Sequence, residues 1–303
     1  MSGRIKTGVC GWTDKTLLES GWYPAEADDA ESRLRFYASR FPLVENDATY
    51  YAVPAVRQSE LWAARTPDDF TMNVKAFAPL TTQHTDPKRL PKDIRSEIPA
   101  EVLEKRRAYP KDLGQGVVAE LARRFRAALE PLHASGKLGA VLFQYPPWFV
   151  ISRENKDEIL AAKELLPDFR LAVEFRNGTW LSERNREETL RFLRDNDLAY
   201  VSVDEPQGFP SSIPPIAAAT SDLALVRFHG RNADTWRKQT ETAAERFKYK
   251  YSDAELEEWV PRIEHLATES AEVQVLMNNC YSDFAVTNAK RMGELLAKKE
   301  VSL

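Results

Sequence analysis

Eight short runs of apolar, strand-forming residues alternate with longer runs of helical spacing, and this alternation constrains the fold most strongly. Strand, helix and strand in repeated order is typical of a parallel sheet, because each parallel connection needs a crossover. The predicted strands cover residues 5–10, 43–47, 70–75, 139–144, 170–175, 199–203, 223–229 and 272–277. The predicted helices cover residues 30–40, 55–65, 117–134, 153–166, 185–196, 253–268 and 283–299.

A closed eight-stranded barrel and an open doubly wound sheet both satisfy this order. No Gly-x-Gly-x-x-Gly or phosphate-binding-loop motif follows any strand, which weakens the nucleotide-binding open sheet. We therefore predict an α/β fold of the (β/α)₈ TIM-barrel type. The 303 residues fit one such barrel, and no linker, repeat or low-complexity tract divides them, so we expect a single domain over 1–303.

Two connections after predicted strands are long, 76–116 after strand three and 230–252 after strand seven. In a barrel both lie at the C-terminal face, where active sites form. The connection 204–222 contains four prolines and has room for only a short helix. The 230–252 loop interleaves basic and aromatic residues, which is typical either of a lid over a pocket or of a surface that grips phosphates and stacks bases. We favour the lid.

Composition excludes several classes of protein. Forty-two basic against 46 acidic side chains give a net charge of −4, which does not favour nucleic acid or an anionic membrane. Two cysteines imply no disulfide framework, and no zinc-site spacing occurs. The N-terminal residues lack the apolar run of a signal peptide, and no apolar stretch approaches the ~18 residues of a membrane span. We expect a cytoplasmic protein without membrane contact.

Side chains on successive strand positions face opposite sides of a sheet, so each strand offers an apolar and a polar face. We predict that the apolar faces meet the helices and that the polar faces converge at the C-terminal mouth of the barrel. Buried charges there must pair with one another or with a ligand. The polar faces consist of Glu45 and Asp47, then Thr71, Asn73 and Lys75, then Glu174 and Arg176, then Ser202 and Asp204, then Arg227 and His229, and finally Asn278.

The functional hypothesis favoured by this pattern is an enzyme of lyase, isomerase or hydrolase type that acts on a small polar or anionic, sugar-like or phosphorylated metabolite. Arg176, Arg227 and Arg231 would clamp an anion, since guanidinium suits carboxylate and phosphate. Glu174 or Asp204 would move a proton with His229, and Lys75 would stabilise negative charge. The candidate catalytic residues are Glu45, Lys75, Glu174, Asp204 and His229, and the candidate ligand contacts are Trp12, Asp47, Gln144, Arg176, Arg227, Arg231, Asn278 and Asn279.

Other interpretations stay open. Glu45, Glu174 and Arg176 could form a purely structural ion network, and the paired asparagines could only cap a turn. The carboxylates could hold Mg²⁺ or Mn²⁺, although the sequence assigns no cofactor. Cys10 is expected to be a small buried residue rather than a nucleophile. A nucleic-acid-binding protein using the 230–252 loop and residues 88–111, and a non-catalytic ligand sensor, are alternatives to an enzyme. The oligomeric state is not indicated.

Several motifs make the chain similar to a known family. They are GVCGW (8–12), WYP (22–24), RFYASRFPLVENDATYYAVP (35–54), TPDDFTMNVKA (66–76), LFQYPPWF (142–149), AVEFRNGTW (172–180), VRFHGRN (226–232) and NNCYSDFAVTNA (278–289). Together they resemble the YecE-like family, a bacterial domain-of-unknown-function family with a TIM-barrel fold. The resemblance implies the barrel and a shared polar pocket, but no reaction. The chain departs from the family pattern at Cys10, at Asn46-Asp47 and at Met277.

Overall fold

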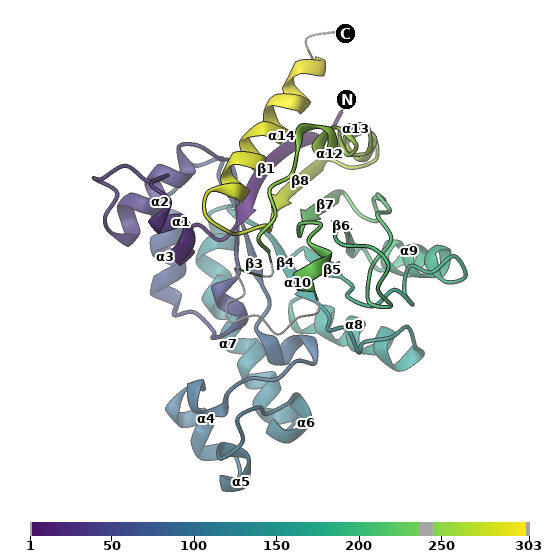
Figure 1. The fold of residues 1–303 in the computed structure, drawn as a ribbon. Helices are drawn as coiled ribbons and strands as arrows, with labels where there is room; N and C mark the ends of the chain where they lie inside the picture. The colour runs from purple at the N-terminus through teal and green to yellow at the C-terminus, as the bar shows by residue number, and fades with distance from the viewer. Residues whose placement is uncertain (1, 237–244, 246, 301–303) are drawn as a thin grey trace.

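Eight parallel strands close into a barrel in the computed structural model, which describes residues 2–236, 245 and 247–300 (Figure 1). The strands neighbour one another in sequence order, and the last pairs with the first. The predicted TIM barrel is therefore confirmed. The strands are β1 (Arg4–Cys10), β2 (Leu43–Asn46), β3 (Thr71–Lys75), β4 (Leu138–Gln144), β5 (Leu171–Glu174), β6 (Ala199–Asp204), β7 (Leu223–Phe228) and β8 (Glu272–Met277).

Helices cover the outside of the barrel, and the longer ones bury apolar side chains against it. Those around the barrel are α1 (Lys15–Glu19), α2 (Ala30–Ala38), α3 (Val56–Ala64), α7 (Gln115–Ala134), α8 (Arg153–Leu165), α9 (Arg186–Asp195), α12 (Asp253–Glu257), α13 (Val260–Glu269) and α14 (Phe284–Glu300). The 3₁₀ turn η1 (Ala48–Tyr50) follows β2, and the one-turn helix α10 (Ala233–Trp236) follows β7.

The predicted helix 253–268 is two helices. Ser252 and Glu255 form the expected capping box at the start of α12. Pro261 occupies the first turn of α13, where its missing N–H costs no helical hydrogen bond. The proline therefore starts a new helix rather than continuing the preceding one.

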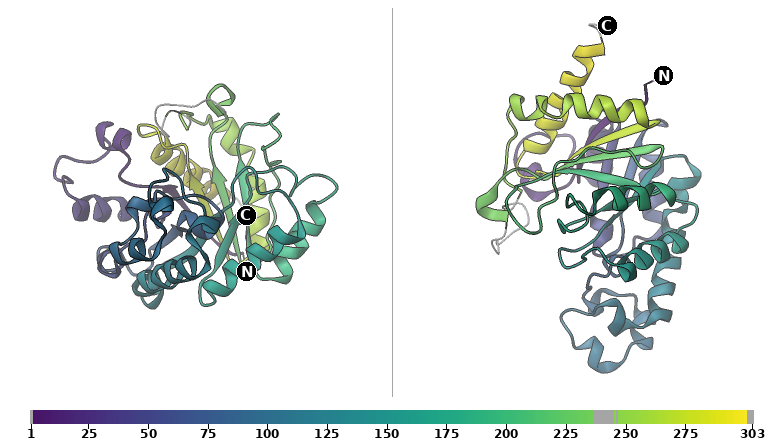
Figure 2. Two further views of the ribbon diagram at one scale, coloured as in Figure 1. Left: turned by 90° about the horizontal axis from the view of Figure 1, so that it is seen from below. Right: turned by 90° about the vertical axis from the view of Figure 1, so that its right-hand side faces the viewer.

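Residues 76–116 form a small helical lobe instead of an open loop. It contains the 3₁₀ turns η2 (Ala78–Thr81) and η3 (Pro87–Arg89) and the helices α4 (Lys92–Glu97), α5 (Ala100–Leu103) and α6 (Pro110–Leu113). The lobe lies at the end of the molecule opposite the two termini (Figures 1 and 2). Its buried apolar side chains, which include Ile94, Ile98, Val102 and Leu113, belong to the same hydrophobic core as the barrel.

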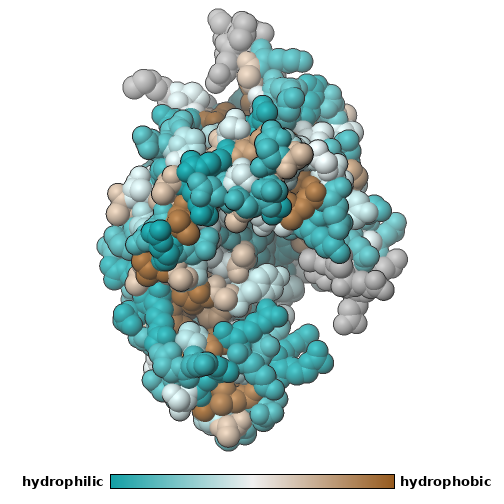
Figure 3. All heavy atoms as spheres, turned by 90° about the vertical axis from the view of Figure 1, so that its left-hand side faces the viewer, coloured by the Kyte–Doolittle hydropathy of each residue, from teal (hydrophilic) through white to brown (hydrophobic). Residues whose placement is uncertain are grey.

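Some of the basic residues of this lobe have acidic neighbours. Lys105 Nζ lies 2.7 Å from Asp112 Oδ1, and Lys88 Nζ lies 3.9 Å from Glu104 Oε2. These ion pairs reduce the positive charge that the lobe would offer to a nucleic-acid backbone. Figure 3 shows one face with polar side chains over most of its area and a hollow between the barrel and the lobe. None of the described helices is long and apolar enough to cross a bilayer.

Toward the N-terminal ends of the strands, the interior of the barrel contains polar side chains that are hydrogen-bonded to one another. Asn73 Nδ2 on β3 donates to Gln274 Oε1 on β8 across 2.6 Å, and Lys6 Nζ donates to Thr71 Oγ1 across 2.5 Å. Gly139 on β4 lies against this layer, and a Cβ at that position would be 2.3 Å from Asn73 Oδ1. Paired polar side chains thus close the barrel interior at the N-terminal ends of its strands.

Candidate active site

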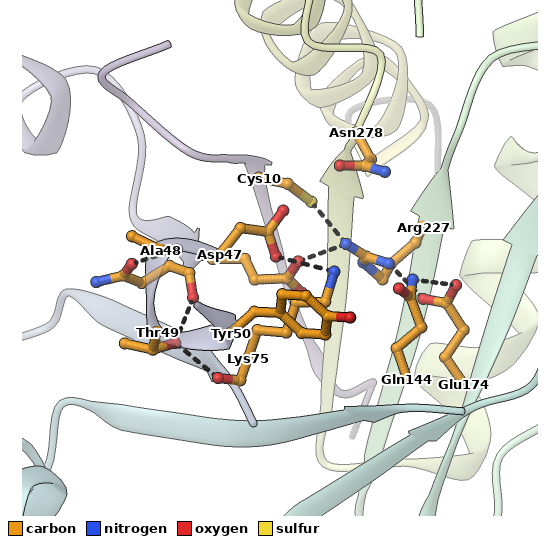
Figure 4. A network of polar contacts seen from close by, with 12 residues as sticks. Cys10, Asp47, Ala48, Thr49, Tyr50, Lys75, Gln144, Glu174, Arg227 and Asn278 are labelled. Carbon is orange, nitrogen blue, oxygen red and sulfur yellow. Dashed lines mark hydrogen bonds and ion pairs between the residues drawn. The ribbon is translucent and has the colours of Figure 1, made fainter. Parts of the chain in front are cut away.

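The side chains at the mouth are placed by strand register. Gln144 on β4 pairs with Glu174 on β5, and Glu45 on β2 pairs with Asn73 on β3. Partners in neighbouring parallel strands point to the same face, which here is the barrel interior. Figure 4 shows the group that results at the C-terminal strand ends, which includes Cys10, Asp47, Lys75, Gln144, Glu174, Arg227 and Asn278.

One guanidinium lies at the centre of this group. Arg227 Nη2 donates to Glu45 Oε1 across 2.5 Å, and Nη1 donates to Glu174 Oε2. All three side chains are fully buried. Ion pairs taken out of water cost desolvation energy, which is recovered only with close contacts of this kind. An ion network therefore exists, but Arg227 joins Glu45 to Glu174, whereas the network considered from the sequence had Arg176 as its cation.

The two carboxyl groups on Arg227 have opposite acid–base properties. Burial, assisted by the nearby Asp47 carboxylate, raises the pKa of Glu45 to about 7 despite the attraction of Arg227. Burial also acts to raise the pKa of Glu174, but Arg227, His229 and Arg176 together outweigh it and hold that pKa well below the usual range. Glu45 thus exchanges a proton near neutral pH, whereas Glu174 stays ionised.

His229 is held between two partners. Its Nε2 lies 3.0 Å from Glu174 Oε1, and its Nδ1 lies 2.8 Å from Asn278 Nδ2. Because the amide nitrogen of Asn278 only donates, Nδ1 accepts that bond and the Nε2 hydrogen points to Glu174. Burial lowers the pKa of His229 to about 4, so the ring is neutral. These pKa directions do not favour the predicted proton transfer between Glu174 and His229, because Glu174 holds no proton to give and the lowered pKa of His229 makes its ring a weak base.

The partly exposed polar groups of the mouth lie on the β2 and β3 side. Lys75 Nζ lies 3.7 Å from Asp47 Oδ1 and 5.0 Å from the centre of the Tyr50 ring. The Lys75 and Asp47 side chains are 15% and 31% exposed, so a ligand can reach them. Tyr50 is fixed in turn by Gln83, which accepts from its hydroxyl and donates to the Gln144 carbonyl.

Strand β6 presents the opposite face to the one predicted. Val201 pairs with Leu225 and Val203 with Arg227, so the two valines point into the barrel. Asp204 therefore points outward, where it accepts hydrogen bonds from Tyr251 and Trp259. The placement of Asp204 in the mouth is wrong. Small apolar side chains fill the narrow interior at this strand, while donors outside the barrel satisfy the carboxylate.

Glu205, which the sequence analysis missed, belongs to the mouth instead. Its carboxylate lies 3.0 Å from Arg176 Nη1, which also lies 3.3 Å from Glu174 Oε1. The guanidinium of Arg176 stacks over the Trp236 ring at 4.8 Å. Continuing the alternation 201, 203, 205 past the end of the strand would have found this residue.

The predicted three-arginine clamp does not form. Arg231 lies outside with Asp204, at 2.8 Å, and with Glu258. Arg227 is fully buried with both terminal nitrogens taken by carboxylates. Only Arg176 is left at the mouth, and it already has two acidic neighbours. Among the described residues of the mouth, Asp47, Glu174 and Glu205 balance Lys75, Arg176 and Arg227, and Glu45 adds a negative charge only when it is ionised, so the mouth does not favour an anionic ligand.

Three further residues considered for the site, Asn279, Trp12 and Cys10, make contacts that stabilise the fold. The Asn279 amide donates to the Tyr249 carbonyl and to Asn288, and so ties the loop after β8 to its neighbours. Trp12 packs in the apolar core. Burial raises the pKa of the Cys10 thiol well above its ordinary value, which leaves it a poor nucleophile, as expected.

Parts of the site hypothesis concern residues outside those described, namely positions 237–244 and 246 of the 230–252 loop. From the described part of this loop, Trp236 and Phe247 have ring centres 6.3 Å from that of His229. No cluster of three or more His, Cys, Asp or Glu in the described ranges is arranged to hold a metal ion.

The family described as protein of unknown function DUF72 matches residues 6–303. The chain belongs to the DUF72 family. The YecE-like resemblance drawn from the motifs corresponds to this family. The chain is similar to the UPF0759 protein YunF of Bacillus subtilis (strain 168), with 34% identity over 296 residues that cover 96% of this chain and 94% of that protein.

Solved DUF72 structures have the same fold. One from Enterococcus faecalis V583 is 26% identical with a TM-score of 0.75, and covers 97% of this chain and 98% of its own. One from Thermotoga maritima MSB8 is 29% identical with a TM-score of 0.74, and covers 97% and 99%. Both are described only as DUF72 family proteins, so they support the barrel but supply no substrate.

Proposed function

We propose that this DUF72 protein is an acid–base enzyme, of lyase, isomerase or hydrolase type, that acts on a small, hydroxyl-rich polar molecule at the barrel mouth. The observation that carries the proposal is the pair of carboxyls on Arg227, whose surroundings move their pKa values apart. Titratable pairs separated in this way are typical of active sites, where one group moves a proton and the other holds a charge.

Glu45 is the group proposed to move the proton. Its Oε1 accepts from Arg227, but its Oε2 is buried and has no hydrogen-bond partner among the described residues. A buried polar atom without a partner is costly, and a substrate hydrogen-bonded to Oε2 would remove that cost. With a pKa of about 7, Glu45 is present in both protonation states at neutral pH, as a general acid–base requires.

Lys75 and Asp47 are proposed to contact the substrate at the exposed side. The Lys75 ammonium would donate to a substrate oxygen that gains negative charge as Glu45 takes a proton. Asp47 would accept from a substrate hydroxyl. The near balance of charge among the described residues of the mouth favours a neutral, hydroxyl-rich molecule over the phosphorylated or anionic one considered from the sequence.

The test is a panel of sugars, sugar acids, sugar phosphates and polyols incubated with the protein in D₂O and followed by proton NMR. Acid–base catalysis is expected to give deuterium incorporation, isomerisation or cleavage of a polyol or sugar. Glu45→Gln should reduce the rate by about 10²–10⁴-fold. Glu60→Gln, an exposed change on α3, is the matched control and should retain the rate.

A ligand that raises the melting temperature without being converted would instead indicate the non-catalytic sensor. Equal rates in wild type and Glu45→Gln, for any substrate found, would show that Glu45 does not move the proton.

A further inference from the structure

A second pocket, separate from the mouth, opens on the flank of the barrel beyond β3 and β4. Its volume is about 580 Å³, and its walls come from the lobe, from the loop after β4, and from α7 and α8. This volume lies in the range of small-molecule sites, roughly 300–1,000 Å³. None of the groups proposed for proton transfer lines it.

Aromatic and aliphatic side chains dominate the walls. Trp148, in the loop after β4, is 57% exposed. Among the described large hydrophobic residues, only Tyr51 is as exposed. Tyr109 and Pro110 line the lobe side, while Ala161 and Ala162 leave space on α8. An exposed indole beside small residues offers a flat surface on which a planar ring can stack.

The charges at the pocket balance. Lys111 and Glu158 both line it, and neither forms an ion pair with a residue that the structure describes. One ammonium and one carboxylate give the site no net charge. A ligand with a single charge would be attracted by one group and repelled by the other, whereas a neutral or zwitterionic ligand would not be repelled overall.

The backbone of the wall is strained at Thr82, which has φ 60° and lines the pocket. A β-branched residue rarely adopts this left-handed conformation, and such strain concentrates at ligand sites. The hydroxyl of Thr82 is also buried without a hydrogen-bond partner among the described residues. Gln83, the next residue, bonds to Tyr50 and to the Gln144 carbonyl, which holds this wall against the mouth.

We propose that this pocket binds a small planar aromatic molecule that is uncharged or zwitterionic, stacked on Trp148 between the lobe and α8. The volume fits one such molecule. A protein partner would need a surface of about 800 Å² on each side, far more than this pocket offers. The proposal is independent of the chemistry at the mouth.

Four indoles that differ in charge test it on the full chain, by ligand-observed NMR titration: indole (neutral), L-tryptophan (zwitterion), indole-3-acetate (anion) and tryptamine (cation). Indole and L-tryptophan are expected to bind saturably and more tightly than the two singly charged compounds. Trp148→Ala should weaken indole binding by about tenfold. Ala161→Phe, which fills the pocket from an exposed position on α8, should weaken it similarly.

Val150→Ala is the matched control, because Val150 is exposed in the same loop but does not line the pocket. Retained affinity in this variant with loss in Trp148→Ala and Ala161→Phe supports the site. The proposal is overturned if none of the indoles binds saturably, if Trp148→Ala binds indole as well as Val150→Ala does, or if a singly charged indole binds most tightly. Melting curves of the three variants establish that each is folded.

Discussion

Glu45 and Glu174 bind opposite terminal nitrogens of the same guanidinium, that of Arg227. The arginine alone would lower both carboxyl pKa values. They diverge because Glu174 has two further cationic or donor neighbours, His229 and Arg176, while Glu45 faces the Asp47 carboxylate. The charged and hydrogen-bonding neighbours of each carboxyl therefore decide which of the two titrates near neutral pH.

The titration of Glu45 can be observed without a substrate. We expect a protonated-carboxyl band in infrared difference spectra that disappears as pH rises, with a midpoint of about 7, since burial raises the pKa of Glu45 to that value. Glu45→Gln should lack this band, and Glu60→Gln should retain it. Burial also raises the pKa of Asp14, to about 6, so identical carboxyl titrations in wild type and Glu45→Gln would contradict the assignment.

Asp47 and Asp204 should affect this midpoint differently. Asp47 raises the pKa of Glu45 through its charge, so Asp47→Asn is expected to move the midpoint to lower pH. Asp204 points away from the interior, and Asp204→Asn should leave the midpoint unchanged. It should instead lower the free energy of unfolding by about 2–4 kcal/mol, because Arg231, Tyr251 and Trp259 all donate to this carboxylate. A midpoint that moved equally in both variants would mean that Asp204 acts inside the barrel.

His229 should make stability depend on acidity. Its pKa falls from 6.5 to about 4 on folding. Between these two pH values the ring is therefore largely neutral in the native state and largely protonated in the unfolded chain. This contribution to stability is complete above pH 6.5 and is lost as pH falls towards 4, by on the order of 3 kcal/mol. Urea denaturation at several pH values should show a flatter dependence in His229→Gln than in wild type, and an unaltered one in the exposed control His265→Gln. Identical slopes for wild type and His229→Gln would refute the prediction.

Gly139 and Gly116 offer a matched pair of alanine substitutions. A methyl group on Gly139 would lie 2.3 Å from Asn73 Oδ1 and 2.5 Å from Thr71 Cγ2, in the polar layer at the N-terminal ends of the barrel strands. Gly139→Ala is therefore expected to lower the free energy of unfolding by about 1–3 kcal/mol. Gly116, in the first turn of α7, has open space, and Gly116→Ala should be neutral or stabilising by up to about 1 kcal/mol. Chemical denaturation compares the two, and similar losses in both would show that the barrel interior has room at Gly139.

The sequence by itself determined the order of strands and helices along the chain, because two-residue and 3.6-residue periodicities are local properties. It favoured the closed barrel, but only the pairing of β8 with β1 decided that the sheet closes. Glu45, Lys75, Gln144, Glu174 and Arg227 could be assigned to one mouth, since parallel strands end on the same side. The sequence could not decide which face of β6 enters the barrel. The alternation along β6 separates Val201 and Val203 from Ser202 and Asp204 but does not say which set points inward. That choice depends on the two valines filling the interior and on distant donors such as Trp259 reaching Asp204.

The partners of each charge were likewise decided only by tertiary structure. That Arg227 binds two carboxylates, that Arg231 leaves the mouth, and that Glu45 rather than Glu174 or His229 titrates near neutrality all depend on distances between residues far apart in the chain. Electrostatic energy and desolvation vary steeply over a few ångströms, so a residue's type and strand position name the candidates for acid–base work but do not select among them.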